Sequence, residues 1–276
     1  MEYKRILTVQ DISCVGQCSL TVALPILSAC GHETAVLPSA VLSTHTGGFS
    51  GFTFRDLTED MPAIQAHWQK EGIFFDAIYT GYLGSITQVG YVKNIFENMG
   101  KENAVKIVDP AFADHGKLYC IFNNDYVEAM KTLCPVADIL IPNVSEACFL
   151  TGMEYKETYD EAYIQNLFVA LEGLGCKTVV LTGVGYTEGK TGVAVYQQGK
   201  ISYYEHKKIE KGCHGTGDIY ASAFVGAMMR GKDAYEAAKI AADFTVDCIK
   251  TTLEDPDHWY GARFEPSLSK LIGMLG

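Results

Sequence analysis

The feature that most constrains this chain is a repeated alternation of short apolar runs with longer segments of helical spacing. Apolar runs of about four to six residues bounded by turn residues predict strands that are buried on both faces. Strands of this kind, alternating with helices, pair in parallel and are covered on both sides, so the pattern predicts an α/β fold with a mostly parallel sheet. The predicted strands are Ile6–Val9, Thr34–Leu37, Ala77–Thr80, Val105–Val108, Ile139–Ile141 and Thr178–Thr182, and the predicted helices are Ser19–Ala29, Leu57–Lys70, Ile86–Met99, Asp125–Leu133 and Glu161–Leu174.

The last third of the chain departs from this alternation. Val193–Tyr196 and Ile201–Tyr204 flank a short polar turn, which predicts an antiparallel hairpin near one edge of the sheet. Two helices are predicted after it, at Ile219–Met229 and Ala234–Ile249. The long segment 39–51, rich in glycine, serine and threonine, is predicted to be a loop. Because no low-complexity linker divides the chain, we expect a single domain over residues 1–276.

The composition argues against several classes of partner. A net charge of −11 over 276 residues disfavours nucleic acid and anionic membrane surfaces, which would be repelled. The nine cysteines are scattered without a CxxC motif, as expected of reduced thiols in a cytoplasmic protein. The first residues lack the long apolar segment of a signal peptide, and no stretch approaches the ~20 apolar residues of a membrane span.

Polar or glycine-containing turns follow five of the predicted strands. Ligands bind beyond the carboxyl ends of the strands in open parallel sheets, so these residues are predicted to share one ligand-binding edge. They are Asp11, Gly81 with Tyr82, Asp109, Asn143, and Thr182 with Gly183.

The segment Gly215–Asp218 reads GTGD and opens an apolar helical stretch. Glycines allow a ligand to approach the backbone, and a helix N-terminus offers free N–H groups and the positive end of the helix dipole. Such a segment can stabilise a phosphoryl group in transfer, while Asp218 can accept a proton from an attacking hydroxyl. The alternative is that Asp218 only caps the helix. These four residues alone leave both interpretations open.

Several motifs occur in order along nearly the whole chain. They are TVQDISCVG at 8–16, STHTGG at 43–48, TGYLGS at 80–85, VDP at 108–110, PNVSEA at 142–147 and GTGD at 215–218. Together they resemble the ribokinase-like superfamily, specifically its branch of pyridoxal/pyridoxamine kinases and hydroxymethylpyrimidine kinases. The resemblance implies a ribokinase-like three-layer α/β/α sandwich and transfer of a phosphoryl group from ATP to a small molecule.

The same resemblance assigns roles around the phosphates. Asp218 is implied to be the general base, and the N–H groups of Gly215, Thr216 and Gly217 are implied to stabilise the γ-phosphoryl group. Oxygen ligands suit Mg²⁺, which the resemblance implies together with ATP. The implied ATP-binding residues are Asp109, Asn143, Thr182, Gly183 and Thr216, and those implied to organise the metal are Glu146, Asn143 and Asp109.

On the substrate side, the resemblance implies contacts from Asp11, Thr46 and Tyr82. Pyridoxal kinases commonly carry serine at the position of Asp11, whereas Asp11 and Ser13 together resemble the Asp-x-Ser of hydroxymethylpyrimidine kinases. That second branch often has cysteine where this chain has Asp218. The substrate end of the site is therefore mixed. An aspartate at position 11 would prefer a protonated ring nitrogen or an amine, through a charge-assisted hydrogen bond.

The implied function is ATP-dependent phosphorylation of the 5′-hydroxymethyl group of a vitamin B6 vitamer. One alternative is hydroxymethylpyrimidine kinase, and a second is a non-catalytic ligand-binding relative. A sugar kinase is disfavoured because little room exists for an early lid. The resemblance also implies a homodimer, and it leaves a K⁺ requirement open. His45 and Cys213 are interpreted as ordinary loop residues.

Overall fold

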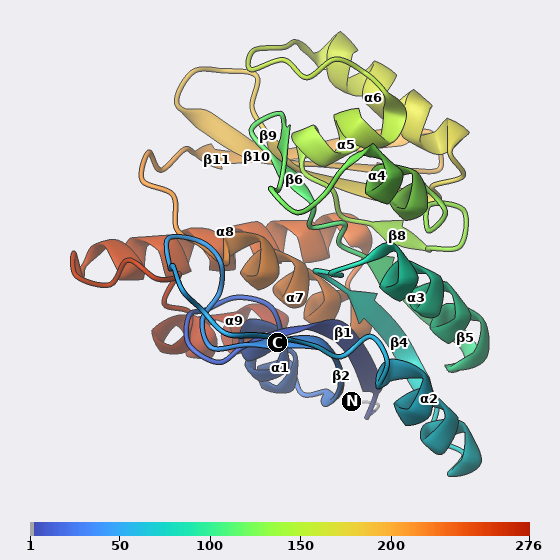
Figure 1. Cartoon of the computed structure of the whole chain (residues 1–276). Coiled ribbons are helices and arrows are strands. Elements are labelled where there is room, and N and C mark those ends of the chain that lie inside the picture. Colours follow the sequence, from blue (N-terminus) through green and yellow to red (C-terminus); the bar gives the residue numbers. More distant parts are fainter. Residues whose placement is uncertain (1–2) are drawn as a thin grey trace.

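A nine-stranded sheet runs through the computed structural model, which describes residues 3–276 (Figure 1). Its order is β11-β10-β9-β8-β5-β4-β1-β2-β3. The strands from β9 to β2 in this order pair in parallel, whereas β10, β11 and β3 are antiparallel to their neighbours. The strands are β1 (Arg5–Ser13), β2 (Glu33–Leu42), β3 (Phe54–Asp56), β4 (Phe75–Thr80), β5 (Gly100–Val108), β8 (Ile139–Leu140), β9 (Thr178–Val184), β10 (Lys190–Gln197) and β11 (Lys200–Lys207), and a separate small ribbon is formed by β6 (Ala113–Asp114) and β7 (Lys117–Leu118).

Helices cover both faces of this sheet (Figure 1). One layer consists of α1 (Leu20–Ala29), α7 (Thr216–Met229), α8 (Ala234–Leu253) and α9 (Leu268–Leu275), the last preceded by a short 3₁₀ turn at Glu265–Ser267. The other consists of α2 (Met61–Lys70), α3 (Ile86–Asn98), α4 (Asn124–Lys131), α5 (Val144–Thr151) and α6 (Glu161–Gly173). The predicted three-layer α/β/α sandwich with a mostly parallel sheet and an antiparallel hairpin at one edge is confirmed.

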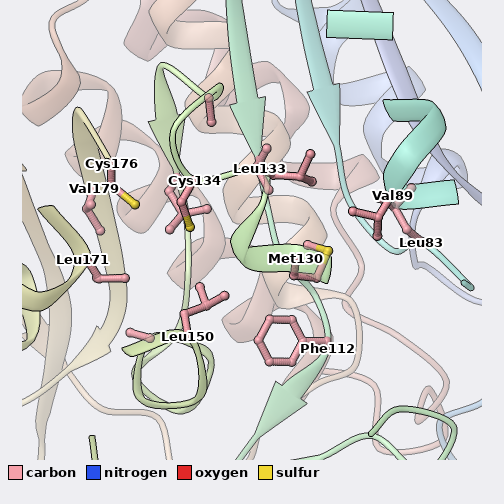
Figure 2. Packing of buried hydrophobic residues seen from close by; sticks show 14 of the residues in the cluster. Leu83, Val89, Phe112, Met130, Leu133, Cys134, Leu150, Leu171, Cys176 and Val179 are labelled. Atoms are coloured by element: carbon pink, nitrogen blue, oxygen red, sulfur yellow. The ribbon is translucent and has the colours of Figure 1, made fainter. Parts of the chain in front are cut away.

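The two cores follow from the alternation of side chains along the strands. In β1, Leu7 and Val9 face the cluster beneath α2–α6, whereas Ile6 faces the cluster beneath α1, α7 and α8. Because successive strand residues point to opposite faces, an apolar strand can contribute to both cores at once. Figure 2 shows side chains of the first cluster, among them Leu133 and Leu150.

The structure differs from the sequence predictions in one loop boundary and in two helices that were not predicted. The predicted loop 39–51 begins later, because β2 continues to Leu42 and pairs with the unpredicted edge strand β3. The helix α5 was missed, since its short segment is buried on nearly every side and so lacks an apolar period. The C-terminal helix α9 was also missed. Within residues 3–276, no helix is long and apolar enough to cross a membrane.

The predicted hairpin is confirmed in β10 and β11, which pair from Lys190–Lys207 to Gln197–Lys200. Its turn places Gln198 at φ 52° and Gly199 at φ 76°. Two successive positive φ angles are the requirement of a tight two-residue hairpin turn whose twist matches that of the strands. The polar turn therefore fixes the register of this sheet edge.

Close packing of α7 against α1 gives a stability prediction. A Cβ atom at Gly226 would lie 2.3 Å from the Cys30 Sγ atom, so Gly226→Ala should lower the free energy of unfolding by about 1–3 kcal/mol through overpacking. The matched control is Gly90→Ala in α3, where a Cβ atom would meet no atom within 4 Å. This variant should raise the free energy of unfolding by roughly 0.5–1 kcal/mol, because alanine favours a helix more than glycine does. Urea unfolding measures both variants. Equal stability of Gly226→Ala and the wild type would contradict this packing.

Candidate active site

The N-terminus of α7 places two glycines in contrasting surroundings. Gly215 has φ 76°, and a Cβ atom there would lie only 1.7 Å from the Gln17 carbonyl oxygen, so the fold itself requires this glycine. At Gly217, by contrast, a Cβ atom would meet no described atom within 4 Å. Glycine disfavours a helix, so packing gives no reason for Gly217. Its open position leaves room for a ligand to approach the free N–H groups of the first turn.

Asp218 does not cap α7, which rules out the capping interpretation. The N-cap position is Gly215, and no side chain caps this helix within the described part of the chain. Burial raises the pKa of Asp218 from 3.8 to about 7, with a further upward contribution from Asp11, while a hydrogen bond from the Ser19 backbone lowers it. A partly buried carboxyl group with a pKa near neutrality is suited to accept a proton at physiological pH.

Asp11 lies within β1 rather than after it, next to a register shift in the pairing of β1 with β2. Its side chain is buried, and its two oxygens accept hydrogen bonds from the hydroxyl groups of Ser19 (2.5 Å) and Ser13 (3.1 Å). Burial raises the pKa of Asp11, and these two hydroxyl groups lower it. Asp11 therefore ties β1 to the start of α1 and presents little surface to a ligand.

The other two predicted substrate residues are more exposed. Tyr82 follows β4 and is partly buried; burial raises the pKa of its phenol, and the charge of Asp11 adds to this effect. Thr46 is exposed in the loop after β2. The adjacent Gly47 packs so closely on the His214 ring that a Cβ atom there would lie 2.7 Å from its Nδ1 atom. Tyr82 thus lies near Asp11, and Thr46 lies beside the segment that leads into α7.

His45 is a buried bridge and not an ordinary loop residue, which corrects the sequence interpretation. The Gly47 N–H donates to its Nδ1 atom (3.0 Å), so its Nε2 atom carries the proton that it donates to the Tyr260 carbonyl oxygen (2.7 Å). Phe49 from the same loop packs on Trp259, with ring centroids 4.6 Å apart. The loop after β2 is therefore held against a C-terminal segment that the sequence analysis missed.

The C-terminal segment, residues 258–262, also contacts the glycine-rich turn at residues 212–215, which leads into α7. The Ala262 N–H donates to the His214 carbonyl oxygen (3.0 Å), and Gly261 forms a parallel bridge with Gln17. The only sequence signal for this role is the dense His258-Trp259-Tyr260 run, which has no periodicity to interpret. Cys213 is partly buried in the turn, and burial raises the pKa of its thiol, so the thiol stays protonated.

Glu146 and Asn143 form a reciprocal capping box at the start of α5. Asn143 Oδ1 accepts from the Glu146 N–H (2.9 Å), and Glu146 Oε2 accepts from the Asn143 N–H (2.9 Å). The other Glu146 oxygen accepts from the Phe112 N–H (2.9 Å). Burial raises the pKa of Glu146 to about 7. Burial together with the charges of Glu146 and Asp218 raises the pKa of Asp109 strongly, so these carboxyl groups share one region.

The oxygen donors of this region suit a hard divalent cation, and Asn143 and Glu146 also serve the capping box. No group of three His, Cys, Asp or Glu side chains within residues 3–276 is arranged to hold one ion. Asn143 Oδ1 and both Glu146 oxygens each accept one backbone N–H group, which fixes their orientation, and one lone pair on each oxygen would remain for Mg²⁺ or its water ligands. The cluster of carboxyl groups supplies the negative charge that such an ion would neutralise.

Thr182 and Gly183 lie in β9 next to this region. Thr182 bridges to Asn143, and its N–H donates to the Pro142 carbonyl oxygen (2.9 Å). Gly183 is exposed, and its carbonyl oxygen accepts from the Tyr159 hydroxyl (3.2 Å). The structure thus brings the ends of β5, β8 and β9 to the same edge, as predicted from the strand pattern.

Comparison with known proteins identifies relatives of this chain. The family model described as phosphomethylpyrimidine kinase matches residues 26–261. The chain belongs to the phosphomethylpyrimidine kinase family. One relative of this family member is the hydroxymethylpyrimidine/phosphomethylpyrimidine kinase of Aquifex aeolicus, 30% identical over 67% of this chain and 72% of the relative.

Two solved structures resemble this family member over nearly their full length. A phosphomethylpyrimidine kinase-like protein from Bacteroides thetaiotaomicron, crystallised with pyridoxal, is 34% identical with a TM-score of 0.92, over 98% of this chain and 96% of that one. The pyridoxal kinase of Lactobacillus plantarum is 30% identical with a TM-score of 0.91, over 99% of this chain and 98% of that one. The relatives therefore include both kinds of kinase to which the sequence motifs point, pyridoxal kinase and hydroxymethylpyrimidine kinase.

The raised pKa of Asp218 makes stability depend on pH. Because folding raises this pKa from 3.8 to about 7, the contribution of Asp218 to stability is present below pH 4 and is lost as the pH rises through 7. Asp218→Asn cannot ionise, so it should be more stable than the wild type by about 1–3 kcal/mol at pH 8, with the difference vanishing near pH 4.

Urea unfolding between pH 4 and pH 8 measures this difference. The control is Asp257→Asn at an exposed position, which should follow the wild-type curve throughout. A wild-type to Asp218→Asn difference that stays constant with pH would show that this carboxyl group is not perturbed by folding.

Proposed function

We propose that this protein transfers the γ-phosphoryl group of ATP to the 5′-hydroxymethyl group of a vitamin B6 vitamer, giving the 5′-phosphate. The observation that carries this proposal is the start of α7, where the open position of Gly217 lies one residue before a carboxyl group with a pKa of about 7. An anion site and a poised base in the same helical turn are what phosphoryl transfer to an alcohol needs.

The proposed reaction divides the work among the residues of this edge. Asp218 accepts the proton of the substrate hydroxyl as its oxygen attacks the γ-phosphorus, and ADP leaves. The N–H groups of Gly215, Thr216 and Gly217 stabilise negative charge on the transferred group. Mg²⁺, when bound, neutralises phosphate charge; Asp109, Glu146 and Asn143 orient its water ligands, and Thr182 and Gly183 contact the nucleotide.

For the substrate, support comes from the pyridoxal bound to the Bacteroides protein and from the Lactobacillus enzyme, named pyridoxal kinase. The partly buried Tyr82 and the exposed Thr46 offer surface for the pyridine ring and its substituents, whereas Asp11 acts mainly through its hydrogen bonds to Ser13 and Ser19. Hydroxymethylpyrimidine is the second candidate substrate. The family description and the name of the Aquifex relative favour it.

A panel of purified reactions tests the function. With ATP and Mg²⁺ we expect kcat/KM to be highest for one of pyridoxal, pyridoxine and pyridoxamine. Asp218→Asn should lower kcat by a factor of about 10² or more, because it removes a positioned base. Adding EDTA should abolish turnover, and an excess of Mg²⁺ should restore it; comparison of Na⁺ and K⁺ buffers tests for a monovalent-ion requirement.

The outcomes separate the alternatives. Turnover of hydroxymethylpyrimidine without turnover of any vitamer would identify the second candidate as the function. No turnover of any compound, with ligand binding retained, would indicate a non-catalytic relative. Near-normal turnover by Asp218→Asn would remove Asp218 from the role of base.

We also propose that the whole chain acts as one kinase domain in a cytoplasmic homodimer. The nine cysteines are all unpaired within residues 3–276, which suits a reducing compartment. The outermost strand β3 exposes Phe54, and Phe52 beside it is also exposed. Exposed aromatic residues on an edge strand favour pairing with a second copy.

Light scattering should therefore give a mass twice the 30.2 kDa of the chain. Phe54→Glu should shift the mass to that of the monomer, because it places a charge in the proposed interface. Exposed Tyr3→Glu, away from this edge strand, is the control and should leave the mass unchanged. A monomeric wild type would overturn the proposed dimer.

A further inference from the structure

A fully buried polar group lies between the sheet and α7, beneath the proposed catalytic residues. It consists of Gln10 in β1, Tyr79 in β4 and Ser222 in α7, each with no exposed surface. The surrounding core is mostly apolar and contains Ile6, Ala77 and Phe224. Buried polar side chains in such surroundings are costly unless they are hydrogen-bonded, so this group calls for a physical reason.

Register and helical spacing bring these three side chains together. Tyr79 in β4 pairs with Thr8 in β1, and Gln10 is two residues after Thr8. The side chains of Tyr79, Thr8 and Gln10 therefore all point to the α7 side of the sheet. Gln10 Nε2 donates to Thr8 Oγ1 at 2.8 Å. Ser222 is four residues after Asp218, and hence about one turn further along the same side of α7.

Three oxygen atoms in this group lack a partner. Gln10 Oε1, the Tyr79 hydroxyl and Ser222 Oγ make no hydrogen bond within the described part of the chain. The side chains of Ser222 and Gln10 nevertheless reach the Tyr79 hydroxyl, and their hydrogen-bonding contribution lowers its pKa. Three converging polar atoms that form no well-aligned hydrogen bond with one another are the usual lining of a buried water site.

The Tyr79 hydroxyl also lies within electrostatic reach of the active-site carboxyl groups of Asp109 and Asp218. Tyr79 pairs with Ile107 of β5, and Asp109 is two residues further along the same side. Burial raises the pKa of Tyr79, and the charges of Asp109 and Asp218 raise it further, so the hydroxyl stays protonated and can donate. The polar group is thus the layer directly beneath the two carboxyl groups.

We propose that Gln10, Tyr79 and Ser222 bind one buried water molecule, which links them to the Asp109–Asp218 pair and makes Tyr79 a positioning residue for phosphoryl transfer. The water accepts hydrogen bonds from the Tyr79 and Ser222 hydroxyls and donates one to Gln10 Oε1. Its second proton remains for a carboxyl oxygen of Asp109 or Asp218. One water molecule therefore satisfies all three unpartnered oxygens and restrains the carboxyl groups from below.

The kinetic part of this inference rests on the proposed function, but its first test does not. A crystal structure at high resolution should show an ordered water within hydrogen-bonding distance of Tyr79 Oη, Gln10 Oε1 and Ser222 Oγ. The water should be absent or displaced in crystals of Tyr79→Phe. If the three side chains instead bond directly to one another with no water, the inference is overturned whatever reaction the protein catalyses.

The second test compares two tyrosines that differ in their neighbours. Tyr79→Phe should lower kcat about tenfold with KM changed less than about twofold, the effect of losing one hydrogen bond that orients a catalytic group. Tyr220→Phe is the matched control. Its hydroxyl is also buried without a partner in the described structure, but burial alone raises its pKa, with no charged neighbour contributing. It should keep wild-type kcat.

Ser222→Ala supplies a second, smaller change, in case Tyr79→Phe fails to fold. It should lower kcat in the same direction. Because both hydroxyls serve the same water, the double variant should lose little more than the worse single variant, whereas combination with Tyr220→Phe should be additive. Wild-type kcat in Ser222→Ala, or additive losses in the double variant, would contradict a shared water.

Discussion

The packing of Gly215, at the start of α7, against Gln17 in the loop after β1 is the contact on which the site depends. Gly215 approaches the Gln17 carbonyl oxygen so closely that no side chain could fit between them. This approach puts Asp218 beside Ser19 and within the electrostatic reach of Asp11. The same Gln17 bridges to Gly261 of the C-terminal segment, which in turn is tied to the loop after β2 through His45 and Tyr260. Together these contacts hold in place segments that are far apart in the chain.

The site is held at an electrostatic cost. Asp109, Glu146 and Asp218 are carboxyl groups whose pKa values are raised by burial, and the charges of Glu146 and Asp218 act on Asp109. Such groups would be better replaced by neutral residues if stability alone mattered. Their retention is understandable if a cation and a reacting hydroxyl relieve the unfavourable charge when the ligands bind, which is the behaviour expected of a catalytic centre.

Much of the fold was predictable because its signals are local. The apolar runs of β1, β4 and β5 and the polar turn of the hairpin each depend on neighbouring residues, so the strand pattern could be interpreted correctly. Helix α5 could not, because burial on nearly every side erases the apolar period that identifies a helix. The extension of β2 to Leu42 was equally hidden, since its partner β3 lies beyond a loop and pairing depends on register.

The sequence by itself determined the α/β class, the sheet edge where polar residues gather, and the glycine-rich helix start, because these follow from spacing over a few residues. Only the tertiary structure decided which of those residues are free to act. It showed that Asn143 and Glu146 are engaged in a capping box, that Asp11 is bound by two serines, and that His45 is a bridge. It also placed Tyr79 beneath Asp109. Hydrogen bonds and burial join residues distant in the chain, and no spacing within a linear sequence records them.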